Sequence, residues 1–289
     1  MIGLSVIGDS YNHKSRSFLE AAMEYKGVYG VSGYWEDADC FFLPDYTCLG
    51  TARIKSLLKA GKHILLGGAG ASGMDELQEL VRTAEENHAV LLEYLHSAFN
   101  PCTGSLEKAL RHLGPIYHVR LYSCQYSFCC RDIHMDTAPG QRQSIRGGAL
   151  FQRGMDCIYP LVRIFGRPVI LNCELVLSGN GLDAAGSING KLGAADVELV
   201  YSKISGSHIP SLIQGQNGSL LIGDLHDFHQ ITYYGPSGTE ESLISCSGPD
   251  CRRAELAQCM DYLSGSKDWH EQLPVSYEIQ QMINEIVGR

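Results

Sequence analysis

The spacing of apolar and polar residues predicts two halves of different character. In the first half, short apolar runs alternate with stretches of helical period, beginning with a strand at 2–7 and a helix at 16–25. Beyond Gly114-Pro115, apolar and polar residues alternate singly, as in half-buried strands, and Asn217-Gly218 signals a hairpin. The other expected helices are 51–59, 74–87, 106–113, 149–165, 252–263 and 276–287, and the other expected strands are 28–34, 40–43, 63–66, 89–92, 117–122, 169–177, 194–204, 211–214, 219–222 and 230–234.

One connection in the first half is unusually short. About five residues separate the predicted strands 28–34 and 40–43, whereas a crossover between parallel strands needs about a dozen or more. No helix is therefore expected between them.

The stretch 147–166 has the most distinctive pattern, because two glycines open it and a single amphipathic helix is predicted over 149–165. Gly154 in mid-helix costs about 1 kcal/mol relative to alanine, which suggests a close approach to the backbone there. Pro160 lacks an N–H, so the carbonyl of Asp156 loses its helical partner. One face carries a polar stripe made of Gln152, Asp156, Tyr159 and Arg163.

Composition narrows the class of protein. The chain has 289 residues, 44% of them hydrophobic, a formal charge of −9 and a pI of about 5.6, which argue against nucleic acid or an anionic membrane as a partner. No apolar run approaches the roughly 20 residues of a membrane span. The eleven cysteines form no CxxC pair, which favours a reducing compartment and a cytoplasmic location.

Charge is unevenly distributed, because the segment 120–167 holds seven arginines, no lysine and three acidic residues. Two interpretations remain open for it: a binding surface for an anionic substrate such as a sugar acid or phosphate, or a solvated face paired with acids elsewhere. Arg153 and Arg163 are the candidate substrate-binding residues of this segment. No metal site is predicted, although Asp224, His226, Asp227 and His229 gather at one hairpin end.

Two loops are candidates for phosphate binding. After the first strand, a G-x-G-x-x-G motif would begin at Gly8, but Ser10 and His13 occupy the places of its other glycines. A second loop, after the strand 63–66, does have this spacing at Gly68, Gly70 and Gly73. It is either a relocated nucleotide site or a loop of small residues at a bend.

The stretch 147–166 resembles the second-domain helix of the Gfo/Idh/MocA family (glucose–fructose oxidoreductase, inositol dehydrogenase and relatives), which are NAD(P)-dependent enzymes acting on sugars and polyols. Family members have an Asp and a His at the substrate carbons, in a pattern G-G-A-L-x-D-x-G-x-H. This chain keeps the glycines, Ala149 and Leu150, but has Gln152 in place of the Asp and Asp156 in place of the His.

Two further segments are similar to the family. GKHILLGGAGA resembles the family's GKHVLCEKPLA, with Gly68 in place of the lysine that contacts the reacting hydroxyl, and GQNGSLLIGD resembles a hairpin of the second-domain sheet. The resemblance implies an α/β chain. A truncated Rossmann-like domain, which lacks a strand–helix piece, is expected at 1–115. An α+β domain with a large, mostly antiparallel, open-faced sheet is expected at 116–289.

The resemblance also implies a function. The substitutions predict a family member that has lost dehydrogenase activity and serves as a sugar-binding or oligomeric partner protein. The alternative is an active NAD(P)-dependent oxidoreductase on a sugar, polyol or sugar acid, with Asp156, Gln152 and Tyr159 at the catalytic positions. NAD or NADP would then contact Gly8, Ser10, Gly68 and Gly70. A homo-oligomer through the second-domain sheet is expected in either case.

Overall fold

The computed structural model describes most of the chain and divides it into two compact units. Unit 1 comprises Met1–Leu95 and Pro249–Asn284, and unit 2 comprises His96–Gly248 and Glu285–Arg289. No helix in the described part is both long and apolar enough to cross a membrane. The described residues are 2–6, 22, 28–30, 37–43, 49–69, 71, 73–126, 148–179, 181–225, 230–245 and 248–288.

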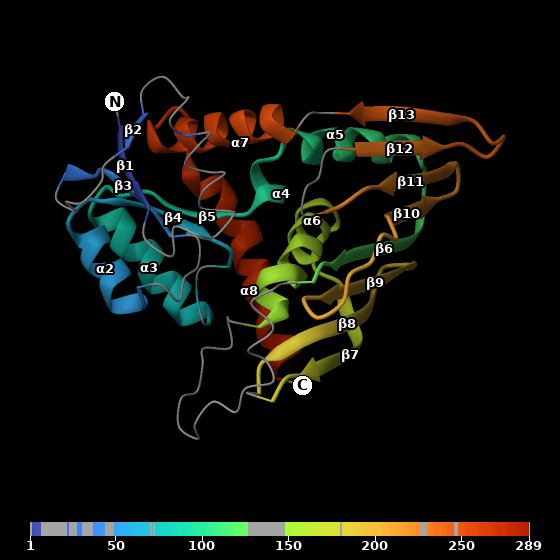
Figure 1. Cartoon of the computed structure of the whole chain (residues 1–289), viewed down its shortest axis with the longest axis horizontal. Coiled ribbons are helices and arrows are strands. Elements are labelled where there is room, and N and C mark those ends of the chain that lie inside the picture. Colours follow the sequence, from blue (N-terminus) through green and yellow to red (C-terminus); the bar gives the residue numbers. More distant parts are fainter. Residues whose placement is uncertain are drawn as a thin grey trace. The chain divides into compact units, whose positions relative to one another are not determined.

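Unit 1 is built on a parallel sheet of five strands in the order β2-β1-β3-β4-β5. Helices α2 (Thr51–Lys59) and α3 (Met74–Glu86) lie side by side against it (Figure 1), because Ile54, Leu58 and Leu77 bury one face of each helix. The Rossmann-like character predicted for this part of the chain is confirmed. The strands are β1 (Ile2–Val6), β2 (Val28–Gly30), β3 (Cys40–Leu43), β4 (His63–Gly67) and β5 (Leu91–Tyr94).

The strand order agrees with the short connection noticed in the sequence. A dinucleotide-binding sheet has the order 3-2-1-4-5-6, and the order seen among the described strands matches that sheet without its strand 3. β2 and β3 lie on opposite sides of β1. The predicted helix 16–25 lies outside the described residues apart from Ala22, and so do the residues 31–36.

Helix α7 (Gly248–Leu263), which follows the last strand, returns to unit 1, and the sequence did not predict this. The buried hydroxyl of Tyr94, at the end of β5, donates a 3.0 Å hydrogen bond to Glu255 of α7. Burial raises the pKa of Tyr94, and the Glu255 carboxylate raises it further. The expected boundary near residue 115 therefore differs from the two units: α7, η7 (Trp269–Gln272) and most of α8 (Leu273–Val287) complete unit 1, whereas residues 96–115 belong to unit 2.

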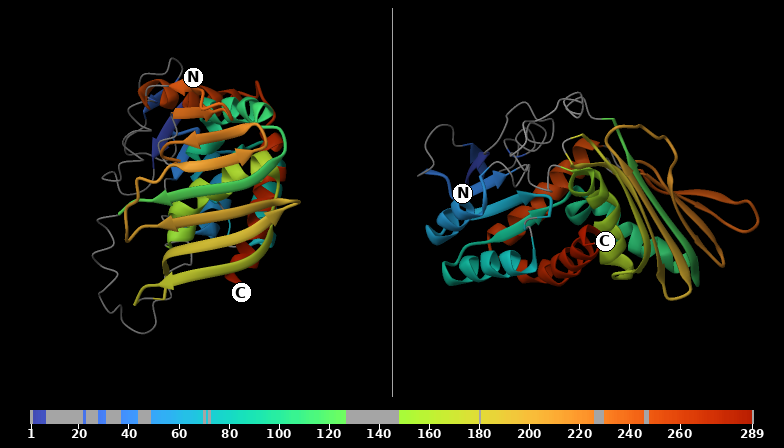
Figure 2. Two further views of the ribbon diagram at one scale, coloured as in Figure 1. Left: turned by 90° about the vertical axis from the view of Figure 1, so that its right-hand side faces the viewer. Right: turned by 90° about the horizontal axis from the view of Figure 1, so that it is seen from below.

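Unit 2 is built on an eight-stranded sheet in the order β13-β12-β11-β10-β6-β9-β8-β7. Figure 2 (left) shows these strands side by side. Among the described strands of this second sheet only β6 and β9 pair in parallel, so the predicted large, mostly antiparallel sheet is confirmed. The strands are β6 (Ile116–Cys124), β7 (Val169–Leu177), β8 (Asp183–Leu192), β9 (Ala195–Ser202), β10 (Ser211–Gly215), β11 (Gly218–Ile222), β12 (Gln230–Tyr234) and β13 (Glu240–Ser245).

Helix α6 (Met155–Phe165) packs on one face of this sheet, against β6 and β9. Two strand-to-strand ion pairs, Lys191–Asp196 and Arg120–Glu198, stand on the opposite face, and Val169 of the edge strand β7 is 68% exposed beside Lys191. The remaining helices of unit 2 are α4 (His96–Phe99), α5 (Pro101–Ala109), and η3 (Leu110–His112).

Helix α5 begins five residues before the predicted start of the helix 106–113. The side chain of Asn100 accepts the N–H of Cys102 at 2.8 Å, and Pro101 occupies the first helical turn, where its missing N–H costs nothing. Asn100 and Pro101 are a helix-start signal that can be read in the sequence, but they precede the apolar residues from which the helix was predicted.

Strands β8 and β13 were missed in the sequence. Most of the inward face of β8 consists of the small residues Ala184, Gly186 and Gly190, and the ring of Tyr201 in β9 fills the space beside Gly186. A Cβ on Gly186 would lie 2.4 Å from the Tyr201 hydroxyl and 3.0 Å from the Glu174 carbonyl oxygen, so glycine is required there. A search for alternating hydrophobic residues therefore does not detect such a strand.

Tyr201 is the largest fully buried side chain of the described core, and its hydroxyl has no hydrogen-bond partner among the described residues. Its ring also packs on Gly154, whose Cβ would lie 3.4 Å from the Tyr201 Cδ1 atom. The close approach to Gly154 predicted from the sequence is confirmed. Burial raises the pKa of Tyr201, so the hydroxyl stays neutral.

The substitution Tyr201→Phe is expected to stabilise the chain by about 1 kcal/mol, because a buried hydroxyl without a partner costs about 1–3 kcal/mol. The measurement is the urea midpoint at an unchanged m value. Tyr122→Phe is the matched control, since the Tyr122 hydroxyl donates to Glu198 at 2.9 Å and its loss should not stabilise. A clear loss of stability in Tyr201→Phe would show that this hydroxyl has a partner.

Candidate functional site

The helix predicted over 149–165 is two elements instead of one. A π-helical turn, η6 (Leu150–Gly154), precedes α6, and the N–H of Met155 donates to the carbonyl of Leu150 five residues earlier. This wider turn inserts one residue at the start of the helix, a feature often found at functional sites. The apolar period alone cannot distinguish a π turn from an α turn, which is why a single helix was predicted.

Asp183 of β8 holds the start of this helix. Its buried carboxylate accepts the N–H of Leu150 at 2.6 Å and also bonds the N–H of Ala149, two of the groups that have no partner inside a helix. Burial raises the pKa of Asp183 above its ordinary value, and the Leu150 N–H and the charge of Lys203 oppose that rise. Asp183 therefore fixes the position of the π turn against the sheet.

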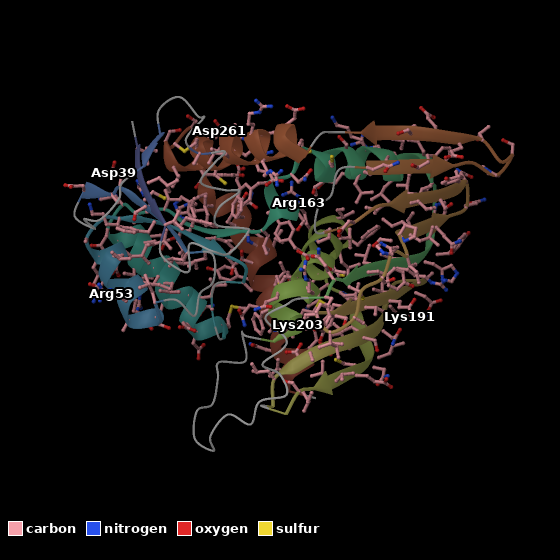
Figure 3. The ribbon with its side chains drawn as sticks, viewed as in Figure 1. Asp39, Arg53, Arg163, Lys191, Lys203 and Asp261 are labelled. Carbon is pink, nitrogen blue, oxygen red and sulfur yellow. The ribbon has the colours of Figure 1, made fainter. Side chains whose placement is uncertain are left out.

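Gln152 and Lys203 meet at the π turn. The Lys203 ammonium donates to Gln152 Oε1 at 3.2 Å. Lys203 follows directly after β9, and Figure 3 shows it near the start of the helix. The Gln152 amide is thus held by a cation.

Asp156 lies one turn further along and is only 8% exposed. Its Oδ2 atom accepts a hydrogen bond from the Ser123 hydroxyl at 2.9 Å. The Nη1 atom of Arg153 lies 3.9 Å from the same oxygen, within reach of electrostatic attraction but beyond hydrogen-bonding distance.

Tyr159 and Arg163 belong to a different part of the helix (Figure 3 labels Arg163). The Arg163 guanidinium donates to Tyr159 Oη at 3.3 Å, to Glu107 Oε1 at 3.1 Å and to the Ala98 carbonyl at 3.4 Å. Burial lowers the pKa of Arg163, but Tyr159 and Glu107 outweigh it and the net direction is upward. These contacts connect α6 to α4 and α5, so the geometry gives Arg163 a structural role.

Gly68 follows β4 in unit 1 with a φ of 118°, a conformation that L side chains rarely adopt. Its N–H donates to the carbonyl of Tyr94 at 3.2 Å, so this N–H points toward strand β5 of the sheet. Helix α3, which follows this loop, has Asp75 and Glu76 in its first turn, where negative side chains oppose an added phosphate. The relocated phosphate site stays a prediction that this geometry does not favour.

The structure thus brings Gln152, Arg153 and Asp156 together at the start of the helix and sets Tyr159 and Arg163 apart from them. The remaining predicted cofactor residues, Gly8, Ser10 and Gly70, lie outside the described residues, as do His226, Asp227 and His229 of the hairpin cluster.

The residues that meet at the start of the helix form a polar cluster made of Ser123, Gln152, Arg153, Asp156, Asp183 and Lys203. Three of them, Ser123, Asp183 and Lys203, were not singled out in the sequence. A signal existed for two of them. On β6 and β9 every second residue faces α6, and continuing that alternation reaches Ser123 and Lys203. No comparable signal marks Asp183, because β8 itself was not recognised.

Comparison with known proteins adds two sequence relatives, while no protein-family profile matches the chain. The NADP(+)-dependent scyllo-inositol 2-dehydrogenase IolU of Bacillus subtilis is 28% identical over 264 residues, which cover 89% of this chain and 80% of that protein. The uncharacterized oxidoreductase YgjR of Escherichia coli is 30% identical over 171 residues, 59% of this chain and 52% of that protein.

Solved structures share the fold over nearly the whole chain. The 3-ketoreductase KijD10 of Actinomadura kijaniata, solved with NADP and TDP-benzene, aligns with a TM-score of 0.81 over 99% of this chain and 97% of that protein, at 16% identity. The probable oxidoreductase yhhX aligns with a TM-score of 0.73 over 100% of this chain and 97% of that protein, at 15% identity.

The substitution Asp183→Ala is expected to lower the free energy of unfolding by about 2 kcal/mol, because it leaves two buried N–H groups without an acceptor. Asp183→Asn is the matched control and should lose less, since its amide oxygen still accepts. Thermal unfolding followed by circular dichroism measures both. Equal losses in the two variants would show that the charge of Asp183, rather than its acceptor role, matters.

Proposed function

The chain belongs to the Gfo/Idh/MocA type of oxidoreductases, and from that premise we propose that it binds a sugar-like or polyol-like ligand in unit 2 but has lost the family's dehydrogenase turnover. The observation that carries this proposal is Gly68. By the family resemblance it stands in the place of the lysine, and its backbone conformation, with a φ of 118°, is one that residues with a Cβ rarely adopt.

Hydride transfer from a secondary alcohol needs a group that accepts the hydroxyl proton and donors that stabilise the developing oxyanion. A general base contributes about 10²–10⁴ to the rate and one such donor about 10²–10³. Gly68 offers no side chain, and Gln152 is an amide that does not titrate and already accepts from Lys203. With these two substitutions, neither position provides a side chain that can take up the hydroxyl proton.

A second candidate function is an active oxidoreductase that uses a different base. Asp156 favours it, because a carboxylate stands in place of the family's histidine, with Arg153 and Ser123 beside it. The similarity to an NADP(+)-dependent dehydrogenase supports a nicotinamide cofactor for this candidate. In the first candidate, NAD or NADP serves at most as a bound ligand.

Turnover separates the two candidates. Purified protein is mixed with NADP(+) or NAD(+) and scyllo-inositol, glucose or gluconate, and absorbance at the reduced nicotinamide band is followed, with IolU as the positive control. Loss of base and donor predicts a kcat/KM at least about 10²-fold below that of the control.

Rates close to the control would contradict the loss of turnover. Asp156→Asn then tests the second candidate. The amide keeps an acceptor for Ser123 but cannot take a proton, so the rate should fall about 10²-fold or more if Asp156 is the base.

We further propose that the chain forms a homo-oligomer through the face of the eight-stranded sheet opposite α6. The exposed Val169 and the paired charges on that face support it. The cytoplasmic location predicted from the sequence stays a prediction.

Size-exclusion chromatography with light scattering tests the oligomer. The expected mass is a multiple of the 31.7 kDa chain, and Val169→Asp is expected to shift it toward the single chain, because a carboxylate is costly to bury. Val287→Asp is the control, since Val287 is exposed on helix α8 and not on a strand of the sheet. A monomeric mass for the unaltered protein would overturn the proposal.

A further inference from the structure

Arg153 is the residue of the polar cluster whose buried donor is left unsatisfied by the described residues. Its Nη1 atom is buried and has no hydrogen-bond partner within the described part of the chain, although 14% of the side chain is exposed. A charged donor that loses water and gains no acceptor costs free energy. Such a group therefore points to an acceptor that comes from outside the chain.

The nearest carboxylate does not satisfy this nitrogen. Asp156 Oδ2 lies 3.9 Å away and accepts the Ser123 hydroxyl at 2.9 Å instead. Asp183, the other carboxylate of the cluster, accepts the N–H of Leu150 at the start of the helix. Both acids are thus engaged in holding the helix and the sheet together.

A second cation stands at the same turn. Lys203 donates to the neutral amide of Gln152, the residue that directly precedes Arg153 in the π turn. The π turn therefore carries two cationic groups, the Arg153 guanidinium and the Lys203 ammonium that Gln152 holds. Guanidinium groups bind carboxylate and phosphate in preference to neutral hydroxyls, because two parallel N–H bonds match the anion's oxygens.

From this arrangement we propose that the ligand of unit 2 is an anionic polyol, a sugar acid or sugar phosphate whose charged group is bound by Arg153 with Lys203 beside it. This inference rests on the proposed ligand-binding function and adds the chemical class of the ligand. It also distinguishes Arg153 from Arg163, whose guanidinium is engaged by Glu107, Tyr159 and Ala98.

The test compares probes of matched length by isothermal titration calorimetry at low salt: sorbitol, gluconate, and sorbitol 6-phosphate. Sorbitol is neutral, and the other two carry the anion as a carboxylate or as a phosphate. At least one anionic probe should bind about tenfold or more tighter than sorbitol, and added salt should reduce this preference. The anionic probe that binds more tightly shows whether the site prefers a carboxylate or a phosphate.

Variants assign the preference to a residue. Arg153→Gln should bring the anionic probe to within about twofold of sorbitol, and Arg153→Lys should retain part of the preference, because the charge remains while the fork is lost. Arg167→Gln is the matched control: Arg167 is paired with Glu285 and belongs to the same unit, so the preference should persist. Circular dichroism verifies that each variant is folded.

Three results would overturn the inference. Equal binding of sorbitol and the anionic probes would refute the ligand class but leave a ligand-binding protein. An anionic preference that survives Arg153→Gln would refute the assigned residue. No binding of any probe would refute both this inference and the binding role, whereas NADP-dependent turnover of gluconate would contradict only the proposed loss of activity.

Discussion

The polar cluster of unit 2 depends on the contact between Asp183 and the first N–H groups of the site helix. A helix start leaves its first N–H groups without partners, and here a carboxylate from β8 supplies the acceptor at 2.6 Å. The contact sets the π turn in place, and the π turn in turn puts Gln152 beside Lys203 and Arg153 beside Asp156. A polar interaction between a strand and a helix therefore determines which polar side chains gather at the start of the helix.

Packing imposes a second constraint on the same helix. The ring of Tyr201 lies against both Gly154 and Gly186. A Cβ on Gly186 would clash with the Tyr201 hydroxyl, whereas a Cβ on Gly154 would be in van der Waals contact with the ring. The hydroxyl of Tyr201 is buried. The helix can approach the sheet closely at this point, which brings Asp156 within reach of Ser123 on β6.

The sequence predicted the elements whose apolar period is strong. Helix 51–59 and strands 169–177 and 230–234 match the structure at both ends. It missed β8, because glycine and alanine carry its inward face, and it joined two helical elements into one, because a π turn changes hydrogen bonding without changing the apolar period. Partners that come from other strands, such as Lys203 for Gln152, depend on sheet register, which local pattern does not determine.

The conformation of Gly68 restricts which residues this loop can accept. With a φ of 118°, the backbone at this position is shaped for a residue without a Cβ, and its N–H donates to the carbonyl of Tyr94. Any other L residue, lysine included, would be strained there. Such a residue could be accommodated only if the backbone of the loop were rebuilt around it, so the main chain itself selects the residue at this position.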